Sequence, residues 1–454
     1  MKEKNKEIQE NKMGFMPIPG LLFSMALPMM VSMLVQALYN IVDSIFVSML
    51  SEEAFTSVSL AFPMQNLMIG VAAGTGVGMN ALLSKKLGEK EFETADRAAM
   101  QGVFLSFCGY LIFALLGLTI SRQFMLGQNQ DPVIVEGGVT YLTIVCMLSF
   151  GLFGQVIMER MLQSTGKTFY AMITQMTGAV INMIMDPILI FGLAGAPKLG
   201  IAGAAVATVF GQFVATCLAV YFNVTRNREI TLRLSALKPD PGIIRQILMV
   251  GVPSMIMVAI GSVMTFGMNR ILSRFSSTAQ AVFGAYFKLQ SFIMMPVFGL
   301  NNGMIPIIAY NYGARKKDRI LQTIKLSIIA AICIMLVGLM VLQVFPATLL
   351  GLFNASDKLL SIGVPALRII SISYVFAGFC IVSSSIFQAF GNGIFSMVVS
   401  ILRQLVVLLP AAWLFSLSGN LNMVWWSYPL AELMSLLTCL FFLRRLNRTI
   451  ISRL

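Results

Sequence analysis

Two aspartates that lie in strongly apolar stretches are the residues of this chain best placed to do chemistry. Asp43 and Asp186 each precede the outer end of such a stretch by about two turns, and a rise of about 1.5 Å per residue puts both roughly 10 Å below the same surface. An ionisable group there costs about 2.5–3.5 kcal/mol, which makes a functional role the default expectation. Two carboxylates at one depth can share a proton or bind Na⁺ through hard oxygen ligands.

An amide and a hydroxyl accompany the two acids. Asn182 stands four residues before Asp186 and therefore shares its helix face, and Thr208 in the next apolar stretch lies at a similar depth. The pattern predicts a cation site made of Asp43, Asn182, Asp186 and Thr208, and the same four residues would be the metal ligands if the ion were Na⁺. Because the chain contains no histidine, carboxylates must carry any coupled proton.

Further residues are candidates for lining the substrate cavity or supporting the site. Asn40 precedes Asp43 by three residues and shares its face. Met268 belongs to a methionine-rich stretch, and methionine repacks around ligands of different shapes. The full set of these supporting candidates is Gln36, Asn40, Met268, Lys288 and Glu432.

Some of the intramembrane charges also have a structural explanation. For Glu432, pairing with Lys288 or Arg403 agrees with the sequence as well as a transport role does. Glu159 stands next to Arg160 near the end of an apolar stretch, where we expect the two to form an ion pair or to reach the interface together.

The elements that must position these residues are membrane-spanning helices. The chain is 57% hydrophobic and only 11% charged, whereas a soluble domain has about 25% charged residues. Because a helix needs about 20 apolar residues to cross a bilayer, we predict an all-α integral membrane protein with twelve spans, near residues 20–49, 54–83, 98–121, 138–164, 168–193, 200–224, 245–272, 278–312, 320–346, 361–389, 394–416 and 421–443.

The sequence repeats itself at an offset of 225 residues. Six spans per half is an even number, so we expect two six-helix lobes in the same orientation, related by a pseudo-twofold axis along the membrane normal. The predicted lobes are residues 1–224 and 245–454, joined by a linker at 225–244. The offset equates Asp43 with Met268 and Asp186 with Ala411, so the acid pair belongs to the first lobe alone. The register is carried by Pro28 and Pro253, Gly74 and Gly299, Gly78 and Gly303, Gly88 and Gly313, and Gly166 and Gly391.

Charge sets the expected orientation. The net charge is +13, and most of the 32 Lys and Arg fall in loops on the side of the N-terminus, so we predict that both termini are cytoplasmic and that the protein lies in the cell membrane. No basic stripe on a soluble domain suggests a nucleic-acid partner. The six cysteines lie in apolar runs without CxxC spacing, and we expect neither disulfides nor a bound cofactor.

Several motifs resemble the multidrug and toxic compound extrusion (MATE) family. They are LPMM after a basic N-terminus, SKKLGEKEFETA, MERMLQSTGKT, and NMIMDPILIFG followed by LGIAGAAVAT. The resemblance implies export of amphipathic, often cationic, compounds in exchange for H⁺ or Na⁺, with the cation site at Asp43, Asn182, Asp186 and Thr208. The chain departs from other bacterial members by lacking acids in its seventh and tenth spans, so a second-lobe cation site of that kind is not expected.

The function expected from this resemblance is a secondary active multidrug antiporter, and not an enzyme. Its expected partners are small organic cations and the lipid bilayer, and one chain suffices because it contains both lobes. The alternative is a lipid-linked oligosaccharide flippase of the same superfamily, for which Lys288 and Arg403 could hold a pyrophosphate group.

Overall fold

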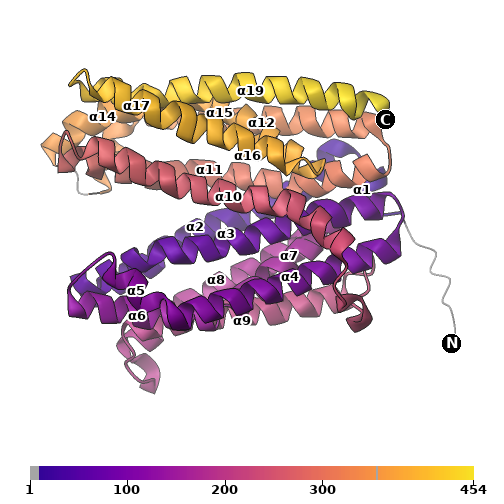
Figure 1. The fold of residues 1–454 in the computed structure, drawn as a ribbon, viewed down its shortest axis with the longest axis horizontal. Helices are drawn as coiled ribbons and strands as arrows, with labels where there is room; N and C mark the ends of the chain where they lie inside the picture. Colours follow the sequence, from indigo (N-terminus) through magenta and orange to yellow (C-terminus); the bar gives the residue numbers. More distant parts are fainter. Residues whose placement is uncertain (1–9, 354–355) are drawn as a thin grey trace.

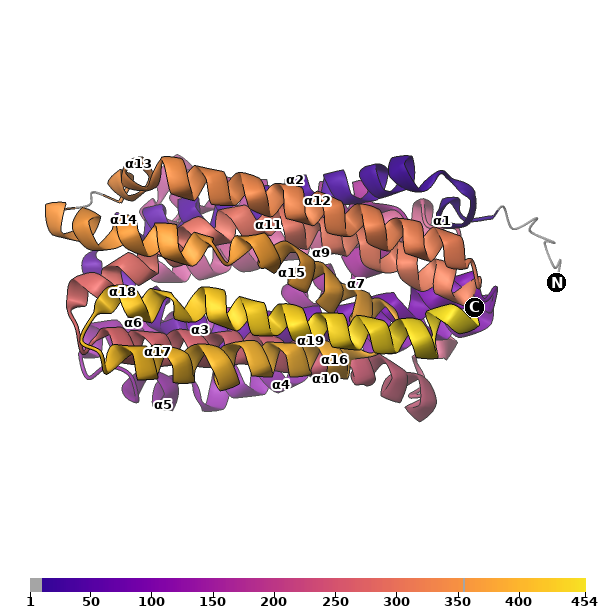
Figure 2. The same cartoon turned by 90° about the horizontal axis from the view of Figure 1, so that it is seen from above.

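The computed structural model describes residues 10–353 and 356–454, and within these ranges it is a bundle of α-helices divided into two lobes. In Figure 1 the helices from α2 to α9 form one lobe and those from α10 to α19 form the other. Seen from above in Figure 2, the helices of each lobe run roughly parallel along the long axis. We call these the N lobe and the C lobe. The end that carries α1 and the C-terminus is called the inner end, and the opposite end the outer end.

Element bounds repeat at the offset of the sequence. In the N lobe the helices are α2 Ile18–Ser48, α3 Glu52–Gly88, α4 Phe92–Thr119, α5 Ser121–Leu126, α6 Pro132–Met147, α7 Phe150–Ser164, α8 Thr168–Phe191 and α9 Ile201–Thr225. In the C lobe they are α10 Pro241–Leu272, α11 Ser277–Gly313, α12 Lys317–Val344, α13 Pro346–Gly351, α14 Asp357–Ser371, α15 Tyr374–Ala389, α16 Gly393–Ile401, α17 Leu409–Ser416, α18 Leu421–Trp425 and α19 Ser427–Thr449. The bounds of α3, α4 and α5 differ from those of α11, α12 and α13 by 225 residues at both ends.

Ten helices in the described part of the chain are long and apolar enough to span a membrane, and two bent pairs complete a set of up to twelve. The predictions of one continuous helix over 138–164 and one over 361–389 were wrong in detail. The first region is α6 and α7, bent by 46°, and the second is α14 and α15, bent by 53°. Neither α2 nor α10 is interrupted at its internal proline. The short helices α1 (Lys12–Phe15), α5, α13 and α18 were not predicted.

Local sequence explains where equivalent helices begin and end. Ser51 and Ser276 each accept a hydrogen bond from the backbone N–H three residues on, which caps α3 and α11. After α7 and α15 the chain turns at Gly166 and Gly391, whose φ angles of +84° and +81° favour glycine. A π-helical segment, Leu402–Leu408, lies between α16 and α17.

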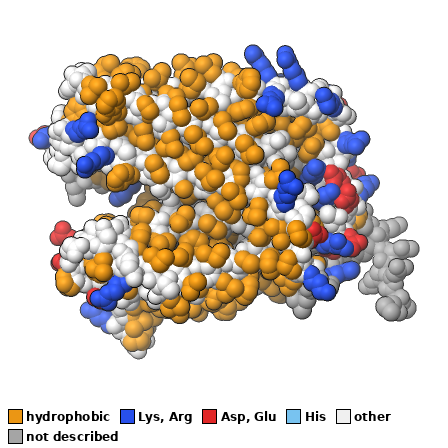
Figure 3. All heavy atoms as spheres, viewed as in Figure 1, with side chains coloured by type: hydrophobic (Ala, Val, Ile, Leu, Met, Phe, Trp, Pro, Cys, Tyr) orange, Lys and Arg blue, Asp and Glu red, His pale blue; other side chains and the backbone are white. Residues whose placement is uncertain are grey.

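The lobes touch through glycines that mark the sequence repeat. A Cβ on Gly74 of α3 would lie 2.7 Å from Gly251 O of α10, and a Cβ on Gly303 of α11 would lie 2.7 Å from Ala26 Cα of α2. Such small residues let helix backbones approach closely. The first helix of each half therefore packs on the second helix of the other half. At the outer end the lobes diverge and leave a cleft between them, on the left in Figure 3.

Candidate functional site

Three of the predicted site residues form a hydrogen-bonded chain in the N lobe. Asn182 and Asp186 lie one turn apart on α8, and Thr208 faces them from α9. With its nitrogen towards the acid, the Asn182 amide donates to Asp186 Oδ2 at 2.8 Å, and its oxygen accepts from Thr208 Oγ1 at 3.2 Å and Thr208 N at 2.9 Å. This orientation satisfies both ends of the amide, whereas the opposite one sets two acceptors against each other, so hydrogen bonding decides it.

The fourth predicted residue, Asp43, reaches this chain from α2. Its carboxyl group lies beside that of Asp186, close enough for the two to share a proton. Asp186 is fully buried, and one oxygen of each acid, Oδ1, is buried without a hydrogen-bond partner among the described residues. None of the ion pairs found in the described chain involves either acid. Two adjacent carboxylates without a fixed cation require a proton or a metal ion between them.

Sequence reasoning missed the tyrosines that complete this cluster. The hydroxyl groups of Tyr39 on α2 and Tyr141 on α6 approach Thr208, and Tyr141 OH donates to Gln65 Oε1 at 3.5 Å. Tyr39 stands four residues before Asp43, so its shared helix face was a signal that could have found it. Nothing in the local sequence connects Tyr141 or Gln65 to the acids, because these residues come from other helices.

The supporting candidates do not join the cluster. Asn40 is exposed and Gln36 is half-buried, and neither side chain hydrogen-bonds to the four site residues. Met268 is buried in the core of the C lobe. Lys288 is exposed and lies over the Phe353 ring at 5.9 Å. Glu432 pairs with a base of its own lobe, since Arg403 Nη1 lies 3.5 Å from Glu432 Oε2.

The expected pairing of Glu159 with Arg160 was wrong. The Glu159 carboxylate accepts hydrogen bonds from Gln155 Nε2 at 3.0 Å and Thr174 Oγ1 at 3.1 Å. Arg160 points the other way and donates to Asn302 Oδ1 on α11 at 2.8 Å. Consecutive residues of a helix project about 100° apart, so Glu159 stays inside the N lobe while Arg160 reaches across to the C lobe.

Comparison with known families agrees with this architecture. Two parts of the chain, residues 28–188 and 253–414, match the MatE family model. The chain belongs to the MATE family. The two matched parts begin 225 residues apart, so each lobe corresponds to one copy of the family's unit. Membership makes this MATE protein a multi-pass membrane transporter and not an enzyme.

Curated relatives of this MATE protein match over nearly their whole length. The multidrug export protein MepA of Staphylococcus haemolyticus is 25% identical over 430 residues, which cover 94% of each chain. MepA of Staphylococcus aureus strain MRSA252 is 24% identical over 419 residues, covering 92% of this chain and 91% of the relative.

Solved structures share the fold. A multidrug resistance MATE family transporter described in an outward-facing conformation matches with a TM-score of 0.91 and 24% identity, over 98% of this chain and 99% of the other. A MATE structure in complex with MaL6 gives a TM-score of 0.90 at 24% identity, over 97% and 100% of the two chains. At this identity the likeness supports the two-lobed fold and leaves the ligands of this chain to be argued from its own residues.

Proposed function

We propose that this MATE protein is a secondary active multidrug exporter that exchanges organic cations for H⁺ or Na⁺. The single observation that carries the proposal is the contact between the Asp43 and Asp186 carboxyl groups, which have no fixed cation beside them. The names of the MepA relatives support the substrate class. We place the protein in the cytoplasmic membrane of a bacterium, acting as a monomer with both termini in the cytoplasm.

Coupling follows from the charge of the acid pair. When the cleft is open at the outer end, a proton or Na⁺ neutralises the pair, which weakens its attraction for an organic cation and releases that cation outward. The Asn182 amide suits either ion: its nitrogen stabilises Asp186 through the 2.8 Å hydrogen bond, and rotation of the amide would offer its oxygen to Na⁺. Net transport requires that the coupling ion and the drug prefer different conformations.

The charges of the C lobe argue against the alternative of a lipid-linked oligosaccharide flippase. A pyrophosphate group needs free bases. Arg403 is paired with Glu432, and Lys288 lies over the Phe353 ring. An organic cation, by contrast, matches the unpaired carboxylates of the N lobe.

Transport by the purified protein in liposomes, under an imposed pH or Na⁺ gradient, tests the proposal. The variants Asp43→Asn and Asp186→Asn each keep the shape of the site and remove one charge. We expect both to lose gradient-driven movement of a fluorescent organic cation such as ethidium. The matched control is Glu136→Gln, which neutralises an exposed acid of the same lobe, paired with Arg122 at the outer end.

Each gradient identifies one coupling ion. Movement driven by pH alone assigns H⁺, and movement driven by Na⁺ at equal pH assigns Na⁺. Parent-level, gradient-dependent transport by both aspartate variants would overturn the coupling site, and movement of a lipid-linked sugar in place of ethidium would overturn the substrate class.

A further inference from the structure

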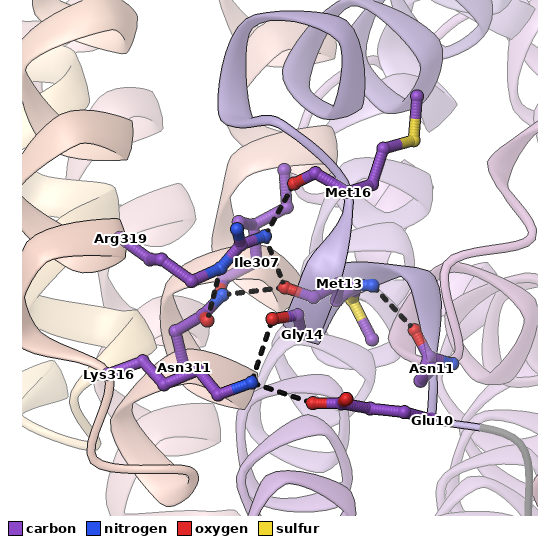
Figure 4. Close-up of polar contacts among 9 residues, drawn as sticks. All are labelled: Glu10, Asn11, Met13, Gly14, Met16, Ile307, Asn311, Lys316 and Arg319. Atoms are coloured by element: carbon purple, nitrogen blue, oxygen red, sulfur yellow. Dashed lines mark hydrogen bonds and ion pairs between the residues drawn. The ribbon is translucent and has the colours of Figure 1, made fainter.

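Residues 10–16 lie across the inner end of the molecule and bond to both lobes. We call this segment, which contains α1, the strap (Figure 4). It precedes α2 directly, and Pro17 joins the two. Although Met13 lies close to the start of the chain, its side chain is completely buried.

The contacts of the strap with the C lobe are many and charge-assisted. Arg319 Nη2 donates to Met13 O at 2.9 Å and to Met16 O at 2.7 Å. Lys316 Nζ donates to Gly14 O at 2.8 Å and pairs with Glu10 Oε1 at 2.6 Å. The carbonyl oxygens that α1 leaves without helical partners are therefore held by cations of the other lobe (Figure 4).

Asn311 completes this side of the contact. Its Nδ2 donates to Met13 O at 3.0 Å, and its Oδ1 accepts from Arg319 Nε at 3.0 Å. Asn311 is fully buried, so the surface that receives the strap is built into the C lobe and is not a chance association of exposed side chains.

On the N lobe the strap is held chiefly by one side chain. Asn11 Nδ2 donates to Thr165 O, in the turn after α7, at 2.9 Å and approaches Glu229 Oε1 at 3.4 Å. Neutral hydrogen bonds of this kind are roughly half as strong as the charge-assisted bonds on the other side. A force that separates the lobes at the inner end will therefore break the Asn11 contact first.

The linker repeats this arrangement on the opposite lobe. Gln101 of α4 in the N lobe donates to Ala236 O at 2.9 Å and Lys238 O at 2.7 Å, and accepts from Asp240 N at 3.2 Å. These linker residues directly precede α10. In both halves, then, the segment before the first helix is bound to the lobe across the cleft.

We propose that the strap is the inner latch of the transport cycle. It holds the inner end closed while the cleft is open at the outer end, and it must leave Thr165 for the inner end to open. This proposal rests on the proposed function in one respect, namely that transport passes through a state open at the inner end. It does not depend on which ion is coupled or which drug is carried.

Spin labels that report the separation of the lobes test the latch. The labels are placed at Glu93→Cys and Asp318→Cys, which are exposed equivalent positions in the first turns of α4 and α12, in a chain whose six native cysteines are replaced. Pulsed electron spin resonance on protein in lipid nanodiscs then gives the fraction of molecules open at the inner end, without any substrate or gradient.

Two variants of Asn11 separate the latch from simple helix capping. Asn11 Oδ1 accepts from Met13 N and caps α1, while its Nδ2 makes the contact with the N lobe. Asn11→Asp keeps the cap acceptor but turns a carboxylate towards Thr165 O and Glu229, whereas Asn11→Ala removes both functions. Because one hydrogen bond corresponds to about a two- to tenfold change in an equilibrium, we expect Asn11→Asp to raise the inner-open to inner-closed ratio by at least about threefold, with a smaller rise for Asn11→Ala.

The matched control is Asn129→Asp. Asn129 also accepts a backbone hydrogen bond two residues on, from Asp131 N, but it lies at the outer end of the N lobe. We expect it to leave the distance distribution unchanged. If Asn11→Asp and Asn11→Ala give the same distribution as the parent and the control, the strap only anchors the chain terminus and the latch is overturned. An opened inner end combined with parent-level transport by Asp43→Asn and Asp186→Asn would support the latch while overturning the coupling site.

Discussion

The two lobes share one scaffold but neutralise their buried acids in different ways. In the N lobe, Asp43 and Asp186 face each other, and no base of the described chain forms an ion pair with either. In the C lobe, Glu432 faces Arg403 at 3.5 Å. A carboxylate with a built-in guanidinium already has its counter-charge. The paired acids of the N lobe have to take theirs from solution, so exchange with an external cation belongs to that lobe.

The repeat shows that the difference lies in side chains and not in the backbone. The positions equivalent to Asp43 and Asp186 hold Met268 and Ala411, both buried in the C lobe. The positions equivalent to Arg403 and Glu432 hold Gly178 and Ala207, both buried in the N lobe. Each lobe therefore places its charges where the other lobe has apolar or small residues, and one helical framework accommodates both solutions.

The largest effect is expected from giving the N lobe the residues of the C lobe. In the double variant Asp43→Met, Asp186→Ala we expect gradient-driven efflux to fall to the level of empty liposomes, because no carboxylate remains to bind the coupling ion. We also expect thermal stability to be no lower than that of the parent, since an intramembrane acid costs about 2.5–3.5 kcal/mol on insertion scales. Efflux in liposomes and the unfolding midpoint in detergent check the two parts. Efflux that still followed the gradient would place coupling elsewhere.

A large effect on stability, with little effect on transport, is expected from breaking the pair of the C lobe. Removing one partner of a buried ion pair costs about 3–5 kcal/mol, and because the Arg403 side chain is 31% exposed we expect about 1–3 kcal/mol for Arg403→Met or Glu432→Gln alone. The double variant Arg403→Met, Glu432→Leu leaves no unpaired charge and should recover most of this loss. Thermal unfolding of the three variants gives the comparison, and efflux should stay within about twofold of the parent. Loss of efflux at unchanged stability would give the C lobe a coupling role.

A moderate effect is expected at Thr208, whose hydroxyl bonds the Asn182 amide at 3.2 Å. Thr208→Val is similar in shape but lacks this donor, so the amide is held less firmly against Asp186. One neutral hydrogen bond is worth about 1 kcal/mol, so we expect transport at a sub-saturating gradient to fall about fivefold. Thr208→Ser keeps the hydroxyl and is the control that should restore transport. Equal rates for the Val and Ser variants would show that the hydroxyl is not needed.

The smallest effect is expected from pH at the inner end. Hydrogen bonding to Lys316, followed by its positive charge, lowers the pKa of Glu10 from its ordinary value of 4.5. A lowered pKa gives a stabilisation that is complete above the unfolded value and is lost as pH falls through the folded value, which here lies below 4.5. The spin-label distances between the lobes should therefore not change through Glu10 between about pH 6 and 8. Glu10→Gln, which removes the charge at every pH, should also change them little because the group is exposed. A change in this range that Glu10→Gln abolishes would make the strap a pH sensor.

Most of the helices could be predicted, because length and apolarity are local properties. The ends of the span predicted at 394–416 fall within one residue of the observed 393–416. The bends between α6 and α7 and between α14 and α15 were missed, since both regions are apolar throughout and no proline marks the break. The strap was missed as well: a four-residue helix has no detectable periodicity, and its partners Lys316 and Arg319 lie about 300 residues away.

The sequence by itself determined the two repeated halves, the spans and the depth of each acid, because these follow from the number and spacing of apolar residues along one helix. Only the tertiary structure decided which groups meet: Asp186 with Asp43, Glu432 with Arg403 but not Lys288, and Arg160 with Asn302 but not Glu159. These choices depend on how each helix is rotated about its axis and on which neighbour it packs against. Both are set by many small contacts between distant parts of the chain, which no local pattern records.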